Sequence, residues 1–446
     1  MSLDPIALFR DVATTVPAYR HFLAERDVDP AGVVSRADFR TLPTITKENY
    51  LRAYPLPDRC RGGSLDGCDT VALSSGSSGL PTVWPRRLED ELAATARFAQ
   101  IFRNFGAEER STLAVICFPL GNWVGGMFTA AACRHLAARG FRILVATPGN
   151  VVDEILRVVS ALGEFYEQTV LLGYPPFVRN VIDAGAARGV DWPARRLKLV
   201  FAGEVFSERW RDLVCDRAGI DDPVTDTAAM YGTADAGVLG NETPLSVRVR
   251  RRIDDPATVF GDARLPTLVQ YDPAHRYFES EGGALVFTAD GAVPLVRYDI
   301  GDDGGVLPYA DLAPEGAEPE EAGPEQPFVY VFGRTLFAVS LYGANVFPEN
   351  VAEALEAPDL VGWTTGRFVM RVPENGRFDV TVELAPGHQG EGREARVADA
   401  IRSHLVAVNS EFAHYVPEDR QHPEVRFRPV GDPDNFPVGV KHRYSR

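Results

Sequence analysis

The stretch TLAVICFPLGNWVGGMFTAAACRHLAARGFRILVAT (residues 112–147) begins and ends with a short apolar run, and the segment between the runs has helical spacing. Strand, helix and strand in this order are typical of a parallel βαβ unit. The alternation continues with the apolar runs TVLLGY (169–174) and KLVFAG (198–203). Helices are predicted at 90–104, 124–138, 151–162, 176–188 and 207–219. The pattern predicts an α/β fold, in which a large layered domain has a sheet flanked by helices and substantial parallel pairing.

The segments around this core predict further elements. Residues 5–25 carry apolar side chains at mostly helical spacing, so we expect an N-terminal helix there. TVAL (70–73) and PTVW (81–84) predict two strands, and residues 260–310 favour β-structure rich in turns. The basic residues within 248–252 are followed by acidic residues at 254–255. This arrangement favours a solvated strand face over a binding patch.

The last 110 or so residues have a pattern of their own. Two strands are predicted at 367–372 and 377–384, an amphipathic helix at 391–409, and a further strand at 424–430. These elements predict a small, mobile α+β domain that acts as a lid. We therefore expect two domains, residues 1–333 and residues 334–446.

Composition excludes several classes of protein. The net charge of −16 argues against a nucleic-acid or anionic-membrane partner, because such partners bind clustered Lys and Arg. No apolar run is long enough to span a membrane, and the first residues lack a signal-peptide pattern, so we expect a cytoplasmic protein. Reduced, buried thiols are expected for the five cysteines, Cys60, Cys68, Cys117, Cys133 and Cys215.

A loop rich in Ser and Gly lies between the two strands predicted near residue 77. Consecutive backbone N–H groups in such a turn can bind an anion, and small hydroxyl side chains add hydrogen-bond donors. No Lys-Ser/Thr pair follows the last glycine, so this is not a Walker A loop. Taken alone, the loop is more typical of a flexible linker.

Other motifs occur with this loop in a fixed order. They are LPTITKENYLRAYPL (42–56), SSGSSGLPT (74–82), AGEVFSERW (202–210), MYGTADAG (230–237), PLVRYDIGD (294–302) and GRTLFAVSLYGANVFPENV (333–351). Together they resemble the adenylate-forming superfamily of acyl-CoA synthetases, peptide-synthetase adenylation domains and luciferases. Within it, the sequence most resembles the phenylacetate–CoA ligase group. The resemblance extends from about residue 8 to the C-terminus and implies an AMP-forming ligase that uses ATP and Mg²⁺.

The resemblance also implies roles for individual residues. The ATP phosphates would be held by Ser74, Ser75, Gly76, Ser77, Ser78, Gly79 and Thr82. The adenine pocket would include Gly203, Glu204, Tyr231, Gly232 and Thr233. Asp302 would accept hydrogen bonds from the ribose hydroxyls, and Arg334 would reach the ribose or phosphate. Asp235 would bind Mg²⁺, and Lys441 would stabilise charge on the α-phosphate during adenylation. Three of these residues have a structural alternative: core packing for Tyr231, a turn for Asp302 and a solvated tail for Lys441.

The sequence departs from the family pattern at five positions. Asp235 replaces the usual Glu, and Ala234 replaces a Thr that touches the α-phosphate. Leu336 replaces the Asp or Lys of the hinge, and Tyr342 replaces an Arg. The usual Gly directly before Lys441 is Val440. We expect the ATP half-reaction to be retained and the CoA half-reaction to be the less secure of the two.

The resemblance implies that a small, aromatic carboxylic acid is activated as an acyl adenylate and passed to a thiol such as CoA; an amine acceptor stays open. An apolar substrate pocket is predicted at Trp123, Gly125 and Gly126, with helix packing as the alternative for these residues. Two other functions remain: activation of nitrite for diazotisation of an arylamine, and non-catalytic adenylate binding. A homodimer is compatible with the resemblance.

Overall fold

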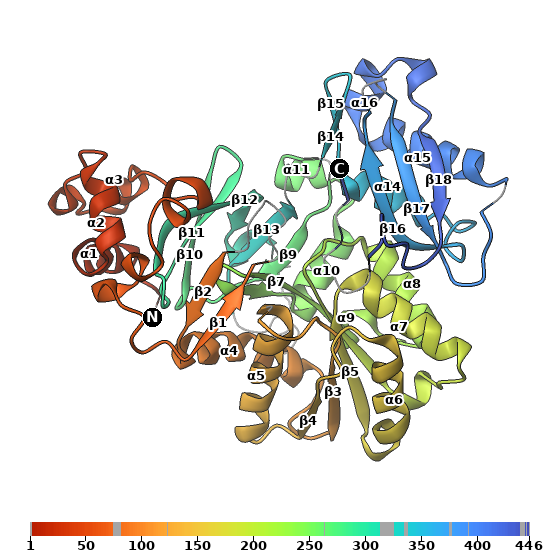
Figure 1. Cartoon of the computed structure of the whole chain (residues 1–446), viewed down its shortest axis with the longest axis horizontal. Helices are drawn as coiled ribbons and strands as arrows, with labels where there is room; N and C mark the ends of the chain where they lie inside the picture. The colour runs from red at the N-terminus through yellow and green to blue at the C-terminus, as the bar shows by residue number, and fades with distance from the viewer. Residues whose placement is uncertain are drawn as a thin grey trace.

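The computed structural model describes residues 2–74, 82–122, 124–262, 264–312, 325–333, 338–373, 377–390, 392–437, 442 and 444–445. Within these residues the central element is a sheet of 11 strands in the order β10-β11-β12-β13-β9-β8-β7-β6-β5-β3-β4. Figure 1 shows the sheet in the middle of the molecule, between the N-terminal helices and a small C-terminal domain.

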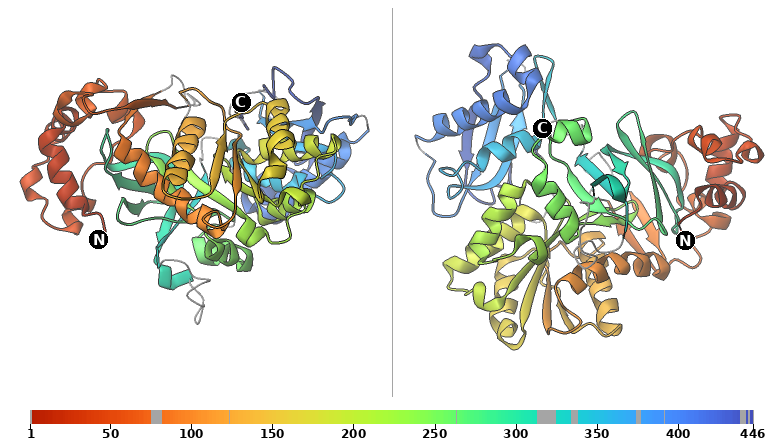
Figure 2. Two further views of the ribbon diagram at one scale, coloured as in Figure 1. Left: turned by 90° about the horizontal axis from the view of Figure 1, so that it is seen from below. Right: turned by 180° about the vertical axis from the view of Figure 1, so that it is seen from behind.

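The half of the sheet from β7 to β4 is parallel, as the alternation of strands and helices predicted. Its strands are β3 (Thr112–Ile116), β4 (Ile143–Ala146), β5 (Gln168–Gly173), β6 (Leu197–Ala202) and β7 (Thr227–Thr233). One face is covered by α4 (Leu88–Asn104) and α5 (Val124–Ala138). The other is covered by α6 (Val152–Leu162), α7 (Pro175–Ala187) and α8 (Glu208–Ala218). Because helices cover both faces (Figure 2), the inner strands are continuous apolar runs.

The other half of the sheet is antiparallel. Its strands are β8 (Gly237–Asn241), β9 (Thr267–Gln270), β10 (Arg276–Glu281), β11 (Ala284–Ala289), β12 (Leu295–Leu307) and β13 (Phe328–Gly333). Parallel pairing stops at β7 because the connection to β8 is a short turn, which leaves no room for a crossover helix. The turn-rich β-structure predicted for 260–310 is confirmed.

Two local predictions are wrong. The expected N-terminal helix is two helices, α1 (Pro5–Thr15) and α2 (Pro17–Ala24), because Val16 is extended before Pro17. The basic run is part of helix α10 (Pro244–Arg252) and not a strand. Arg250 in this run is buried and paired with Glu208 at 2.7 Å. Residues 246 and 250 lie on the same side of the helix, and this side is buried. Arg250 therefore points inward although it belongs to a basic run.

Short elements complete the large domain. The N-terminal segment adds α3 (Arg36–Arg40), η1 (Pro30–Gly32), η2 (Lys47–Leu51), η3 (Pro57–Arg59) and η4 (Arg61–Gly63) and packs on the antiparallel strands. The predicted strands around the Ser/Gly loop form an antiparallel hairpin of β1 (Thr70–Leu73) and β2 (Val83–Arg86). The remaining elements are α9 (Pro223–Asp226), α11 (Pro256–Phe260), α12 (Tyr309–Leu312), η5 (Gly163–Phe165) and η6 (Pro193–Arg195).

The small C-terminal domain is α+β, as predicted, and has its own apolar core. Its sheet pairs β17 (Asp379–Leu384) antiparallel with β16 (Thr364–Arg371) and parallel with β18 (Glu424–Arg428). The other elements are β14 (Val339–Leu341), β15 (Ala344–Val346), α14 (Pro348–Leu355), α15 (Glu394–Val408), α16 (Ser410–Tyr415) and η8 (Glu418–Arg420). The boundary between residues 333 and 334 stays a prediction.

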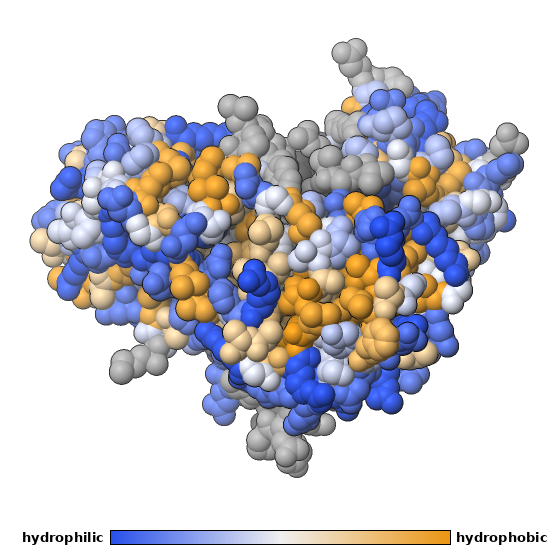
Figure 3. Space-filling view, turned by 60° about the horizontal axis from the view of Figure 1, so that its bottom comes forward, coloured by the Kyte–Doolittle hydropathy of each residue, from blue (hydrophilic) through white to orange (hydrophobic). Residues whose placement is uncertain are grey.

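Other sequence-based expectations concern thiols and surface. The five cysteines are free; four are buried and Cys68 is half-buried. Among the described residues, no helix combines the length and apolar character needed to cross a membrane. The face in Figure 3 shows apolar residues in separate patches among hydrophilic ones, as is common on protein surfaces.

Candidate functional site

The predicted nucleotide residues gather where two neighbouring parallel strands end. Gly203 and Glu204 follow β6 directly, and Tyr231 to Thr233 form the end of β7. Ala202 is paired with Met230, so the two groups lie side by side. Open α/β sheets bind ligands at the carboxyl ends of their parallel strands. The fold therefore places these residues where a ligand site is expected.

Two tyrosine–aspartate hydrogen bonds connect the end of β7 to β12. The Tyr231 hydroxyl donates to Asp302 Oδ2 at 2.8 Å, and the Tyr298 hydroxyl donates to Asp235 Oδ2 at 2.7 Å. Both carboxylates are buried. Because each bond joins a residue near β7 to a residue on β12, the bonds fix the two halves of the sheet against each other. Asp302 is thereby held beside the aromatic ring predicted to contact adenine.

The N-terminal motif supplies a cation to this group. Lys47 Nζ lies 3.3 Å from Asp235 Oδ2, and its side chain is only 15% exposed. The motif is held on β12, since the Ile45 backbone N–H donates to Arg297 O and its carbonyl accepts from Asp299 N. The side chains of Lys47 and Asp235 therefore form a largely buried ion pair. No prediction assigned a role to Lys47, although the motif that contains it was singled out.

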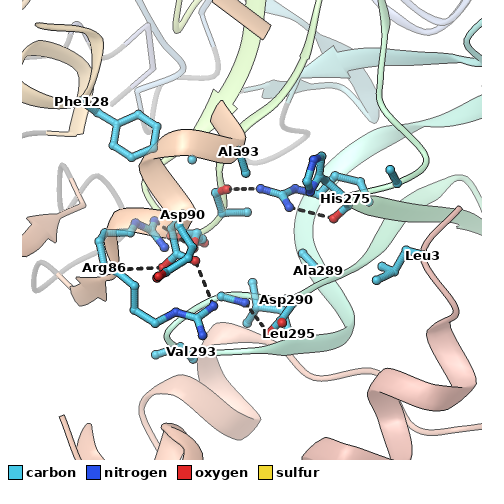
Figure 4. Close-up of a pocket in the computed structure, with 18 residues that line it drawn as sticks. Leu3, Arg86, Asp90, Ala93, Phe128, His275, Ala289, Asp290, Val293 and Leu295 are labelled. Atoms are coloured by element: carbon cyan, nitrogen blue, oxygen red, sulfur yellow. Dashed lines mark hydrogen bonds and ion pairs between the residues drawn. The ribbon is translucent and has the colours of Figure 1, made fainter. Parts of the chain in front are cut away.

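The turn that carries Asp235 is tightly held. Arg86 donates to the carbonyl oxygens of residues 234 and 235, and Arg276 donates to that of residue 236. Both arginines line a polar cavity of about 270 Å³ next to the turn. Figure 4 shows Arg86 and Asp90 on one side of this cavity and His275 on the other. Burial lowers the pKa of Arg276 to about 10. Thr233 Oγ1 accepts from Ala236 N at 3.0 Å, so its hydroxyl serves the turn.

The base of the phosphate loop is closed by its two end residues. Ser74 N donates to Thr82 O at 3.0 Å, and Thr82 N donates to Ser74 Oγ at 2.8 Å. The loop residues between them, Ser75, Gly76, Ser77, Ser78 and Gly79, lie outside the described residues, as do Trp123, Arg334, Leu336, Val440 and Lys441. Their predicted roles stay predictions.

The backbone after β6 needs a glycine. Gly203 has φ of +91°, and a Cβ there would lie 2.6 Å from the Tyr174 ring. Glu204 accepts a hydrogen bond from the Tyr444 hydroxyl at 2.6 Å. Burial and the nearby charge of Glu204 raise the pKa of Tyr174 to about 12. The Tyr174 ring, the Glu204 carboxylate and Tyr444 of the C-terminal tail thus lie together at the end of β6.

Comparison with known proteins bears on the fold. No family model matches the chain. The solved structure of 2-hydroxyisobutyryl-CoA ligase in the postadenylation state, in complex with R3-HIB-AMP, aligns with a TM-score of 0.66 at 16% identity, over 99% of this chain and 88% of that one. The acyl acid amido synthetase AtGH3.15, in complex with 2,4-DB, aligns with a TM-score of 0.59 at 12% identity, over 95% and 85%. These likenesses show the fold.

Sequence similarity adds a relative. The phenylacetate–coenzyme A ligase of Thermus thermophilus is 27% identical over 354 residues, which cover 78% of this chain and 72% of that protein. This similarity, together with the fold, supports an AMP-forming ligase.

One of the residues predicted to line the substrate pocket, Gly126, is explained by packing of the helix. Gly126 is buried in the first turn of α5, and a Cβ there would lie 2.2 Å from Pro119 O. Gly125 has only ordinary contacts with Phe118. A glycine at 126 is therefore required by helix packing, which was the stated alternative to a role in the pocket.

Mg²⁺ fits the ligase site through a single carboxylate. Tyr298 and Lys47 occupy Oδ2 of Asp235, and no described residue bonds to Oδ1. The described residues contain no group of three or more His, Cys, Asp or Glu that could hold a metal. Mg²⁺ is commonly bound by one or two carboxylates together with substrate phosphates and water. The site is suited to a metal that arrives with ATP.

Tyr342, one of the residues that depart from the family pattern, lies in a hairpin turn. It lies in the turn between β14 and β15 with φ of +53°, followed by Gly343 at +89°, and its side chain is 49% exposed. Two consecutive positive φ angles are typical of a tight hairpin turn.

Three residues of the candidate site were not predicted from the sequence: Lys47, Tyr298 and Tyr444. Lys47 and Tyr298 lie in motifs quoted above, and Tyr444 lies in the C-terminal tail. Only their contacts in the structure identify them.

Proposed function

We propose that this ligase uses ATP to activate a small, aromatic carboxylic acid as an acyl adenylate and then passes the acyl group to a thiol such as CoA. The acid's carboxylate oxygen attacks the α-phosphorus, a new P–O bond forms, and the bond to the leaving pyrophosphate breaks. Activation of a carboxylic acid through an adenylate is common to the ligases whose structures are similar. The aromatic substrate is suggested by the similarity to phenylacetate–coenzyme A ligase.

The observation that carries the proposal is the hydrogen bond between Tyr231 and Asp302. It places a buried carboxylate next to an aromatic ring at the carboxyl end of β7. A carboxylate accepts two hydroxyl donors at once, which suits a ribose, and a flat ring suits adenine. The Tyr231 hydroxyl keeps one Asp302 oxygen oriented, so less side-chain freedom is lost when a nucleotide binds.

The phosphate end of the proposed site would combine four sources of positive potential. Backbone N–H groups of the loop between β1 and β2 would contact the β- and γ-phosphates. Mg²⁺, bound through Asp235, would neutralise charge on the triphosphate. Lys47 lies at the same carboxylate. Lys441 would stabilise charge on the α-phosphate from the lid.

Pyrophosphate–ATP exchange tests the proposal. Purified enzyme, ATP, Mg²⁺ and radiolabelled pyrophosphate are incubated with each member of a panel of aryl and aryl-alkyl acids. Label is expected in ATP with at least one acid, and Asp302→Ala should lose it at least 100-fold. Asp311→Asn, an exposed aspartate on α12, is the control and should exchange as wild type does. A flat result across the panel would overturn the proposal.

The same assay separates the other substrates and acceptors. Nitrite with an arylamine replaces the acid in one arm, and AMP is measured with and without CoA or an amine. If AMP forms only with nitrite, the substrate is the oxyanion; if ATP binds without any turnover, the protein is a non-catalytic adenylate binder. AMP that requires both an acid and CoA supports the thiol acceptor.

A further inference from the structure

The C-terminal tail of the lid makes a contact with the nucleotide pocket. Tyr444, two residues from the end of the chain, donates its hydroxyl to Glu204 Oε2 at 2.6 Å. Glu204 directly follows the end of β6 in the large domain, 240 residues earlier in the sequence. Figure 1 places the end of the chain at the junction between the two domains.

Within the lid, the tail is anchored along β16. Met370 N donates to Tyr444 O at 2.7 Å, and Ser445 forms a bridge with Met370. His442 Nε2 donates to Phe368 O at 2.6 Å. The Tyr444 ring packs against Phe368 and His442, with ring centroids 4.9 and 4.5 Å away. These contacts all lie inside the small domain, whereas the hydroxyl of Tyr444 reaches Glu204 in the large domain.

The charges around Tyr444 favour this direction of the bond. Burial and the negative charge of Glu204 raise the pKa of Tyr444 well above its ordinary value, while Arg367 lowers it. The hydroxyl therefore stays protonated and donates, and the carboxylate accepts. A hydrogen bond to a charged acceptor contributes more than one between neutral groups.

Other contacts between the domains involve residues that were not predicted to bind the nucleotide. Arg179 donates to Val361 O at 3.0 Å and to Thr364 O at 2.7 Å, and Ser207 donates to Glu356 at 2.5 Å. These contacts hold the lid on α7 and on the start of α8. The bond from Tyr444 differs from them because its partner stands next to the adenine site.

We propose that Tyr444 is a positioning residue for the adenylation step, which sets the C-terminal tail against the nucleotide pocket through Glu204. The inference rests on the proposed function. Lys441 precedes Tyr444 by three residues, and three residues of chain span at most about 11 Å. Fixing Tyr444 therefore limits the region that Lys441 can reach.

Tyr444→Phe tests the role, because it keeps the ring packing and removes only the hydroxyl. The kcat of pyrophosphate–ATP exchange should fall about tenfold or more, with the KM for the acid within about twofold of wild type. The matched control is Tyr415→Phe, an exposed tyrosine of the same domain, which should behave as wild type. Wild-type exchange by Tyr444→Phe overturns the proposal.

The partner is tested in the same way. Glu204→Ala removes the acceptor of the hydrogen bond and should match Tyr444→Phe. The double variant Tyr444→Phe/Glu204→Ala should be no slower than either single variant, because both remove one interaction. Additive losses would show that the two side chains act separately and would overturn the pairing.

Hydrogen–deuterium exchange separates a failure of this inference from a failure of the proposed function, since it requires no turnover. Peptides that contain residues 442–446 and Met370 should exchange faster in Tyr444→Phe and Glu204→Ala than in wild type and Tyr415→Phe. If tail protection is unchanged in both variants, the anchor is wrong even when exchange activity exists. If the tail loosens but wild type activates no acid, the anchor stands and the proposed function falls.

Discussion

At the scale of single residues, the site depends on a few buried hydrogen bonds and one ion pair. Asp235 is 2% exposed and shares Oδ2 between Tyr298 and Lys47. A buried carboxylate is costly unless it is paired, because it has left water. Lys47 therefore stabilises the fold at the same carboxyl group through which the ligase is proposed to bind its metal, and its contribution can be measured without substrate.

Lys47→Met should lower the free energy of unfolding by about 3 kcal/mol, because it leaves Asp235 charged and without its cation. Denaturant unfolding measures this change. Adding Asp235→Asn to Lys47→Met should recover most of the loss, since the buried charge is then gone. If the double variant is as unstable as the sum of the two single variants, the pair is not the source of the effect.

At the scale of secondary-structure elements, α5 is set by the contact between its first turn and the chain before it. Gly126 lies against Pro119 O, whereas its neighbour Gly125 meets Phe118 at ordinary contact distance. The two adjacent glycines thus differ in what a methyl group would do, and each serves as the control for the other.

Gly126→Ala should destabilise the protein by about 2 kcal/mol or more, because the new Cβ clashes with backbone that cannot move aside easily. Gly125→Ala should be neutral or stabilising by up to about 1 kcal/mol, since alanine favours a helix over glycine. Thermal unfolding of both variants checks the pair. Equal Tm values would contradict the packing role of Gly126.

Elements were predicted well from sequence where local pattern decides them, and less well where contacts between distant segments do. The helix over 124–138 was predicted with its observed bounds, because its apolar spacing is a local property. The inward turn of Arg250 was missed, since it depends on Glu208 from another helix. Tyr298 and Lys47 were missed for the same reason. The roles of Asp302 and Tyr231 came from family resemblance, and spacing alone left a turn and a core residue as alternatives.

At the scale of the whole molecule, the contact between the lid and the large domain contains a titratable group. Glu356 is 7% exposed and accepts from Ser207 of the large domain. Burial, with a smaller effect of the charge of Glu353, raises its pKa to about 7, although the hydrogen bond from Ser207 and the charges of Arg209 and His404 lower it. In the unfolded chain the same carboxyl ionises near its ordinary value of 4.5.

A raised pKa in the folded state means that the protonated carboxyl stabilises the fold. This contribution is complete below pH 4.5 and is lost as the pH rises through 7. Between pH 6 and pH 8 wild type should lose about 1 kcal/mol from this group, and Glu356→Gln should not. Tm measured at both pH values checks this, with exposed Glu418→Gln as the control. A pH dependence identical in Glu356→Gln and wild type would contradict it.

The bridge between Ile45 and Tyr298 has a consequence for synthesis of the chain. The partners are about 250 residues apart, and the apolar side chains of α1 and α2 pack on the same late strands. On the ribosome, at about 5–20 residues per second, the N-terminal segment would wait roughly 10–50 seconds for β12 to emerge. During that time buried residues such as Phe9 and Phe22 have no partner strand to cover them. We therefore expect nascent chains of this ligase to need chaperone protection until its last large-domain strands are made.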